Sequence, residues 1–239
     1  MMTEVHAYQQ ATKCYAQLKQ IQSAKGIGPN AKGRPQISQW QTISSTPDYW
    51  NDRWPKFSGT VWYKLTWQFH CDEKQNQPMM LSVSFINMAG QVYINDHFLW
   101  QNKSLEEPLS RNLNIPRRWM LPVGILKPGE NTVYIRVEGV SELNPGIGFV
   151  HLGDYESVMA KHEHYWLEMR DLLTYTLCLE VALGLIAAFV WLFRRKESAF
   201  GYYALATLLW VLYIGMKLIT EPLFALKTLD FARIQSLIF

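Results

Sequence analysis

The feature that most constrains this chain is an apolar run near its C-terminus, Leu172–Phe193. Glu180 is the one ionisable residue in this run. A helix needs about twenty predominantly apolar residues to cross roughly 30 Å of hydrocarbon, so the run predicts a transmembrane helix. The residues before it are polar and rich in Trp, Tyr, Pro and Gly. The two parts of the chain are therefore expected to face different solvents.

Three consecutive cations, Arg194, Arg195 and Lys196, follow directly after the apolar run. The positive-inside rule assigns such a cluster to the cytoplasmic side of a membrane. Everything before Leu172 is therefore expected to lie outside the cytoplasm.

A second apolar stretch, Ala199–Ile219, predicts another span that forms a helical hairpin with the first. A third stretch over residues 231–239 predicts the start of a further transmembrane helix that is cut short. We therefore expect a piece of a larger membrane protein. We also expect a missing or misassigned start, because Met1–Lys25 lacks the apolar core of a signal peptide.

Glu180 falls about eight residues, or roughly 12 Å, below the outer end of the first span. Carboxylates inside a membrane usually face a helix bundle and have a partner. Lys217, near the outer end of the second span, could bend its side chain toward Glu180. The alternative is a protonated Glu180 bonded to a neighbouring helix, with Lys217 extended to the membrane surface.

The polar part contains several segments with strand character: Gly59–Phe69, Leu81–Ile86, Gln91–Trp100 and Leu126–Val137. The first two alternate apolar and polar residues, which is typical of a half-buried strand. The third predicts a hairpin around Asn95 and Asp96, since both residue types tolerate the positive φ of a tight turn. Short strands separated by turn signals predict an all-β sandwich over residues 39–155.

Elements of a different kind are expected on both sides of this sandwich. Apolar residues recur at helical spacing near the start of the chain, at Val5, Tyr8, Ala11, Tyr15, Leu18 and Ile21. They predict an N-terminal helix that is followed by a Gly- and Pro-rich loop, and the two together span residues 1–38. Residues 156–171 lack β alternation and predict a linker helix that continues into the first span.

Three cysteines are present, and Cys178 lies inside the apolar run, where it behaves as a small hydrophobic residue. Cys14 and Cys71 remain as one pair. A disulfide between them suits an oxidising compartment, but two cysteines do not define a disulfide framework. Free thiols therefore stay open as the alternative.

Composition and motifs argue against several function classes. The net charge of +3 and the absence of a basic stripe exclude nucleic acid as an expected partner. His162 and His164 would point away from each other on a helix, so we expect a solvated face there and no metal. Glu106 and Glu107 precede a proline in an expected surface loop. We expect neither a cofactor nor a catalytic residue in this chain.

Four phrases in order, GTVWYKLTW, GQVYINDHFLW, PLSRNLNIPRRWMLP and LKPGENTVYIRV, resemble the galactose-binding-like class of jelly-roll domains. The segment RRKESAFGYYALATLLWVLYIG resembles bacterial seven-transmembrane receptors with diverse intracellular signalling modules. Together the resemblance extends from about Trp54 to the C-terminus. It implies a homodimeric receptor in the bacterial inner membrane with a periplasmic jelly-roll sensor domain. It also implies a cytoplasmic output domain, a histidine kinase or a diguanylate cyclase, that this sequence does not contain.

A jelly-roll domain binds ligands in its end loops or on a concave face, where aromatic residues and polar anchors suit a small polar ligand such as a carbohydrate. The densest cluster of this kind is Arg111, Asn112, Asn114, Arg117, Arg118 and Trp119. The alternative is that this cluster braces a loop against the core. We expect Trp50, Trp54 and Trp100 to pack in the interior.

Two other functions stay open from the sequence. One is a membrane-tethered carbohydrate-binding or scaffolding module. The other is a membrane enzyme that uses Glu180 within the helix bundle.

Overall fold

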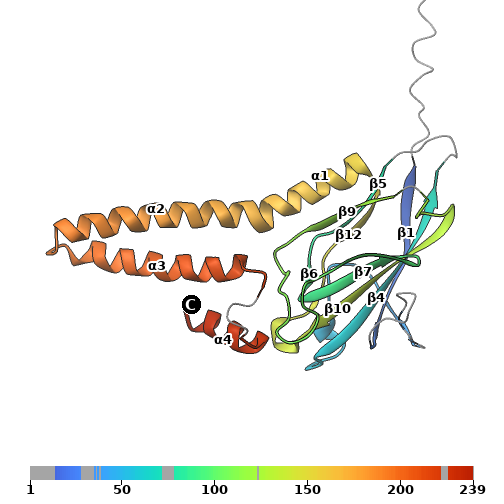
Figure 1. Cartoon of the computed structure of the whole chain (residues 1–239), viewed down its shortest axis with the longest axis horizontal. Coiled ribbons are helices and arrows are strands. Elements are labelled where there is room, and N and C mark those ends of the chain that lie inside the picture. Colours follow the sequence, from blue (N-terminus) through green and yellow to red (C-terminus); the bar gives the residue numbers. More distant parts are fainter. Residues whose placement is uncertain are drawn as a thin grey trace, which may run out of the picture.

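The computed structural model describes residues 14–27, 35, 37, 39–71, 78–122, 124–221 and 226–238. In this part of the chain an antiparallel β-sandwich is followed by a long helix and two further helices (Figure 1). The long helix leaves the sandwich at its last strand and extends away from it, and the next helix returns alongside.

The larger sheet has six strands in the order β2-β1-β4-β10-β7-β8, all paired antiparallel. They are β1 (Tyr15–Lys25), β2 (Gln41–Ile43), β4 (Gly59–His70), β7 (Ala89–Ile94), β8 (His97–Gln101) and β10 (Gly129–Gly139). Strands β4 and β10 form its centre, and their register is unbroken from the pair Phe69 and Gly129 to the pair Gly59 and Gly139.

The facing sheet has three strands in the order β12-β5-β9. They are β5 (Met79–Val83), β9 (Arg117–Leu121) and β12 (Val150–Asp154). A small third sheet has the order β3-β11-β6, formed by β3 (Asp48–Tyr49), β6 (Ile86–Asn87) and β11 (Gly146–Ile147). Two short 3₁₀ turns complete the sandwich, η1 (Trp50–Asp52) and η2 (Ser141–Leu143).

The core lies between the two larger sheets, where alternate residues of β4 and β10 meet those of β5 and β12. Trp50 is fully buried in this core, and its Nε1 donates to the Phe57 carbonyl at 3.1 Å. The expectation that Trp50 packs in the interior is therefore confirmed. Tyr63 is also fully buried and donates its hydroxyl to Asp48 at 2.8 Å. Burial raises the pKa of Tyr63 well above its ordinary value.

Two local predictions from the sequence are confirmed. The alternating segment Gly59–Phe69 forms strand β4, with its apolar residues in the core. The predicted hairpin forms between β7 and β8, and Asn95 occupies its turn with a φ of 52°. Its side-chain amide donates to the Ile125 carbonyl at 2.9 Å, which holds the turn in place.

Strand β5 differs from its half-buried prediction because all five of its residues are buried. Ser82 lies on the face that the sequence pattern assigned to solvent, yet it is fully buried. Helix α1 (Tyr155–Trp166) packs on β5 and excludes water from it.

The predicted N-terminal helix is wrong for the residues that the structure describes. Tyr15, Leu18 and Ile21 lie in strand β1, which pairs with both β2 and β4. These long-range backbone hydrogen bonds outweigh a local helical spacing. Residues 1–13, which carry the rest of the helical pattern, lie outside the described residues.

Cys14 and Cys71 are joined by a disulfide with a Cα–Cα distance of 4.2 Å. The pairing of β1 with β4 explains this contact. Tyr15 lies opposite His70 in that register, so the adjacent cysteines meet at the same end of the two strands.

The long helix is continuous over Tyr155–Phe193 and contains 39 residues. It consists of α1, a π-helical turn η3 (Leu167–Asp171) and α2 (Leu172–Phe193). Helix α3 (Ser198–Leu218) follows, and the described chain ends in α4 (Thr228–Ile238). The predicted linker over residues 156–171 is thus helical and runs directly into α2.

Helices α2 and α3 pack closely side by side. Gly184 of α2 faces Thr207 of α3, and a Cβ atom at Gly184 would lie 2.5 Å from the Thr207 hydroxyl. A glycine at this position therefore permits the close contact. By length and composition both helices could cross a membrane.

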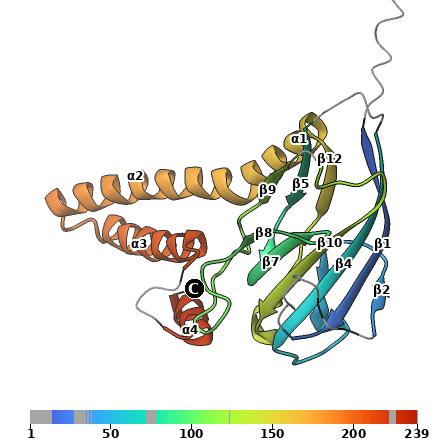
Figure 2. The same ribbon diagram turned by 45° about the vertical axis from the view of Figure 1, so that its right-hand side comes forward.

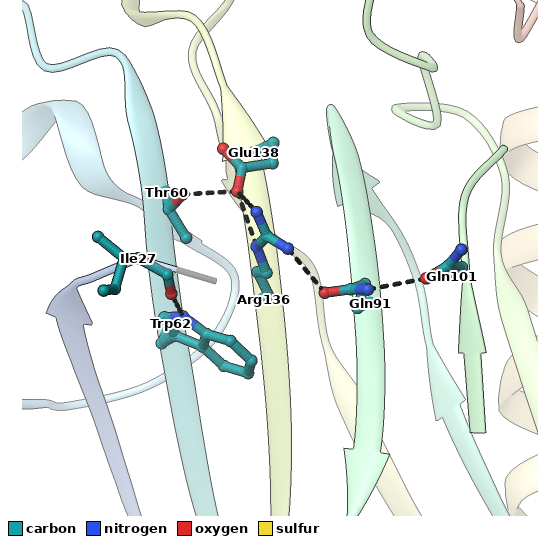
Figure 3. Close-up of polar contacts among 7 residues, drawn as sticks. All are labelled: Ile27, Thr60, Trp62, Gln91, Gln101, Arg136 and Glu138. Carbon is teal, nitrogen blue, oxygen red and sulfur yellow. Dashed lines mark hydrogen bonds and ion pairs between the residues drawn. The ribbon is translucent and has the colours of Figure 1, made fainter. Parts of the chain in front are cut away.

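A chain of polar side chains crosses the outer face of the larger sheet (Figure 3). It runs through Thr60, Glu138, Arg136, Gln91 and Gln101. Glu138 accepts from Thr60 at 2.5 Å and from Arg136 Nε at 2.8 Å. Arg136 then donates to Gln91 at 3.0 Å. These groups satisfy one another, so the chain stabilises the sheet and offers few open donors to a ligand.

Candidate functional site

The sandwich and the helices meet where the β8–β9 connection, residues 102–116, reaches the chain between α3 and α4 (Figure 2). We call this contact the joint. The Arg111 amide donates to the Thr220 carbonyl at 2.7 Å. The Ser110 hydroxyl lies 2.9 Å and 3.0 Å from the two carboxylate oxygens of Glu221. The end of α3 is thus bound to a loop of the sandwich.

The start of α4 is bound to the same loop. The Glu107 carboxylate accepts from the Thr228 amide at 2.9 Å and from its hydroxyl at 2.8 Å. The Thr228 hydroxyl accepts in turn from the Leu109 amide at 2.9 Å. Because a helix N-terminus carries free amides and a partial positive charge, Glu107 caps α4 from the sandwich side.

The first part of the predicted ligand cluster lies at this joint, where its polar groups contact residues of α3 and α4. The Arg111 guanidinium donates to Gln235 at 3.0 Å and lies over the Phe231 ring of α4. Burial lowers the pKa of Arg111. The Asn114 amide is 3.5 Å from the Lys217 carbonyl of α3.

The remaining members of the cluster lie in and next to β9. Arg117 donates to Asn112 at 2.9 Å and covers the Trp100 ring. Trp119 packs against the same ring, with centroids 5.7 Å apart. Arg118 is exposed and contacts the sulfur of Met159 on α1. The bracing alternative therefore describes Arg111, Asn112 and Asn114 better than the ligand alternative does.

One cleft opens at the joint, and a second lies between the sandwich and the long helix. The first holds about 450 Å³ between the sandwich, α3 and α4. Its walls include Arg111 and Glu142 from the sandwich, Lys217 from α3 and Gln235 from α4. The second holds about 410 Å³ between β9 and α1. Arg117 and Arg118 line it from one side and Trp166 from the other.

A further contact ties the long helix to α3 next to the second cleft. Arg170, in the π-helical turn, donates to the Leu218 carbonyl at 3.1 Å. This turn separates the part of the helix that packs on the sandwich from the apolar part. π-helical turns are rare and occur frequently at functional sites.

Glu180 and Lys217 do not form the pair that the sequence left open. Within the described part of the chain no ion pair joins them. Lys217 instead lines the first cleft, with its ammonium nitrogen 5.5 Å from the Tyr213 ring. Glu180 is half-buried on α2.

The basic cluster lies at the far end of α2, away from the sandwich. Arg194 follows the last residue of α2, and the Arg195 guanidinium covers the Trp191 ring. Lys196 is exposed in the turn that leads to α3.

The motif His162-Glu163-His164 departs in one respect from its expected solvated face. His164 is exposed and lies 3.3 Å from Glu168, but His162 is 6% exposed and packs against Trp166. Burial, with a smaller effect of the nearby Arg118, lowers the pKa of His162. The sequence pattern missed this because it does not show that the sandwich covers one face of α1.

Sequence reasoning also missed Glu107, Ser110 and Thr228 as parts of the joint. Thr228 is more than one hundred residues from the other two, and each of the three is an ordinary loop or helix-start residue. A carboxylate two residues before a buried leucine gives no local sign of the helix that it caps.

The comparisons with known proteins give partial likenesses. The β-glucuronidase of Faecalibacterium prausnitzii is 16% identical over 54% of this chain and 22% of its own, with a TM-score of 0.41. A β-glucuronidase from glycoside hydrolase family 2 is 22% identical over 53% of this chain and 14% of its own, with a TM-score of 0.40. The Ruminococcus gnavus β-glucuronidase is 15% identical over 54% and 23%, with a TM-score of 0.40. This chain thus spans less than a quarter of each of these proteins.

No protein-family model matches the chain, and no curated protein matches it. The geometry of the joint is therefore the basis for assigning a function.

Proposed function

We propose that this chain is the sensory input portion of a bacterial membrane receptor. The sandwich lies in the periplasm, and α2 and α3 cross the inner membrane. A small ligand such as a carbohydrate, or an envelope partner, binds the sandwich and changes the arrangement of the helices. The signal passes to a cytoplasmic histidine kinase, or alternatively to a diguanylate cyclase.

The length and surface of the helices support the membrane part of this proposal. The 22 residues of α2 give about 33 Å of helix, enough to cross the hydrocarbon core. Only 6% of the apolar window of the long helix is buried, and that of α3 is 11% buried. A soluble protein rarely exposes so large an apolar surface to water. Contact with lipid would remove this apolar surface from water.

The basic residues support the orientation. Arg194, Arg195 and Lys196 form the turn between α2 and α3, at the end opposite the sandwich. The positive-inside rule assigns this turn to the cytoplasm and hence the sandwich to the periplasm. A disulfide between Cys14 and Cys71 is compatible with that compartment.

The single observation that carries the signalling part is the joint. One sandwich loop holds both the end of α3 and the start of α4, while β12 continues directly into the long helix. Movement of that loop relative to β12 would therefore shift α3 and α4 relative to α2. A ligand drives such a shift only by its different affinity for the two arrangements, and a tenfold difference corresponds to about 1.4 kcal/mol.

Cysteine labelling tests the orientation. Lys103→Cys in the sandwich and Lys196→Cys in the turn are made separately in a Cys178→Ser background. A maleimide that cannot cross membranes should label the first in intact spheroplasts and the second only after lysis. Labelling of both, or of Lys196→Cys alone, would refute the proposed topology.

A cross-link across the joint tests the relay. Glu107→Cys and Thr228→Cys are combined in the full-length receptor, again without Cys178, and oxidised in membranes. We expect the kinase or cyclase output to change several-fold and to lose its response to ligand. The same oxidation of the Cys178→Ser protein controls for effects on the native disulfide. An output that the cross-link leaves unchanged would mean that the joint does not carry the signal.

If the chain were instead a membrane-tethered binding module, the cross-link would have the opposite result. In that case the sandwich would bind its ligand equally well with the joint open or cross-linked, and no output would respond.

A further inference from the structure

The second cleft brings two arginines of the sandwich next to His162 of α1. Pro116, Arg117 and Arg118 form its sandwich wall, and Met159, His162 and Trp166 contribute to its α1 wall. Its volume of about 410 Å³ can hold a small organic molecule and not only an ion. The Trp166 ring and the Met159 side chain provide apolar surface for the body of such a molecule.

Positive groups outnumber negative ones around this cleft. Arg117 and Arg118 line it, and Arg170 is close enough to act on Arg117. Burial lowers the pKa of Arg117, the charge of Arg170 lowers it further, and Glu221 opposes this. Glu163 is the one acidic residue in the cleft wall, and it is exposed to solvent.

Two polar nitrogens at this cleft have no hydrogen-bond partner among the described residues. They are Nδ1 of His162 and Nε of Arg117, and both atoms are buried. His162 is 6% exposed as a whole. A buried polar group without a partner costs about 1–3 kcal/mol, so native proteins rarely leave one unsatisfied without a functional reason. His162 and Arg117 both line the cleft, so a polar group of a bound ligand would lie next to their side chains.

We propose that the second cleft binds a small acidic organic ligand, whose carboxylate or phosphate group lies between Arg117 and Arg118 of the sandwich and His162 of α1. This inference rests on the proposed function and names the ligand class for it. Guanidinium groups match both anions, because they donate two parallel hydrogen bonds. Pro116, Met159 and Trp166 surround the uncharged part of the ligand.

The position of this cleft explains how binding of such a ligand would affect the membrane helices. Trp166 is the last residue of α1, and the π-helical turn begins directly after it. Arg170 of that turn holds the end of α3. An anion that draws α1 toward β9 would therefore change the helix path just before the proposed span.

The test is calorimetric titration of the full chain in lipid nanodiscs with three sugars that differ in charge. Glucose is neutral, glucuronate adds a carboxylate and glucose 6-phosphate adds a phosphate. We expect at least one of the charged sugars to bind at millimolar concentration or better, with affinity that falls as salt rises, and glucose to bind at least tenfold more weakly. The better of the two charged sugars identifies the anion.

Variants assign the binding to this cleft. Arg118→Gln removes an exposed side chain whose recorded contact is with Met159, so the fold should persist. We expect it to weaken binding of the charged sugar about tenfold, as the loss of one charge-assisted hydrogen bond does. His162→Gln should weaken it as well. Lys161→Gln removes a neighbouring cation of α1 outside the cleft and should change affinity less than twofold.

Three outcomes overturn the inference: no binding of either charged sugar, equal binding of glucose, or equal affinities of Arg118→Gln and Lys161→Gln. Hydrogen exchange of α4, measured on the same samples, tests the anion site and the proposed relay separately. Binding without any change in α4 would leave the anion site intact and count against the relay. A change in α4 caused by a different, neutral ligand would support the relay and reject the anion.

Discussion

Replacement of Thr228 by valine would test how strongly the sandwich holds α4. Valine has nearly the same shape but no hydroxyl, so it removes two hydrogen bonds of the joint. One is donated by the buried Leu109 amide at 2.9 Å, and the other is donated to Glu107 at 2.8 Å. Thr228 is 1% exposed, so water cannot replace either bond without a local opening.

The expected cost follows from these two bonds. An orphaned buried amide costs about 1–3 kcal/mol, and the bond to the partly exposed Glu107 adds about 1 kcal/mol. The joint should therefore be destabilised by roughly 2–4 kcal/mol, which corresponds to a ~30- to 1,000-fold larger open population.

Hydrogen exchange of the full chain in nanodiscs measures that population. The amides of α4 and of Leu109 should exchange faster by this factor in Thr228→Val, while those of β4 should not change. Thr228→Ser keeps the hydroxyl and should restore slow exchange. Thr174→Val is the matched control, because the Thr174 hydroxyl donates within its own helix, to the Arg170 carbonyl at 2.8 Å. Equal exchange of α4 in Thr228→Val and Thr174→Val would refute the argument that this residue holds the joint.

Three other perturbations have defined outcomes. Gly184→Ala forces a methyl group to within 2.5 Å of a hydroxyl of α3 and should lower the free energy of unfolding in detergent by about 1–3 kcal/mol. Gly215→Ala meets nothing within 4 Å among the described residues and should leave that free energy unchanged. Glu138→Gln leaves the largely buried Arg136 guanidinium without its carboxylate and should lower the free energy of unfolding in denaturant by about 1–3 kcal/mol. Glu130→Gln, at an exposed position, should change that free energy little. Equal losses in the two variants would contradict a stabilising role of the polar chain. Burial lowers the pKa of His151 from 6.5 to about 4. Between these pH values the unfolded chain binds a proton at His151 that the folded chain does not, so the free energy of unfolding falls as the pH drops from 6.5 to 4. The loss should be about 1–2 kcal/mol after allowance for partial exposure, and an unchanged pH slope in His151→Gln would count against it.

The parts of this protein that the sequence predicted are those with strong local patterns. Alternation over Gly59–Phe69 predicted β4, and Asn95 with Asp96 predicted the hairpin that follows. The apolar run Leu172–Phe193 predicted α2 with the same bounds. Such patterns depend only on residues within one element, so a single sequence contains them completely.

The same local patterns failed where a distant partner decided the structure. The helical spacing that includes Tyr15 and Ile21 belongs to a strand, because β2 and β4 supply backbone hydrogen bonds on both of its edges. Ser82 is buried because α1, more than seventy residues later in the chain, covers it.

The candidate site shows the same division. The local sequence groups Arg111, Arg117 and Arg118 in one short polar segment. Their contacts follow from the packing of the sandwich and the helices. The Arg111 side chain packs against Phe231 of α4, whereas Arg117 and Arg118 line a cleft with His162 of α1. The physical reason is that periodicity and charge are local properties of the chain. The joint instead depends on hydrogen bonds between residues as distant in sequence as Glu107 and Thr228, which come together only when the sandwich and the helices pack.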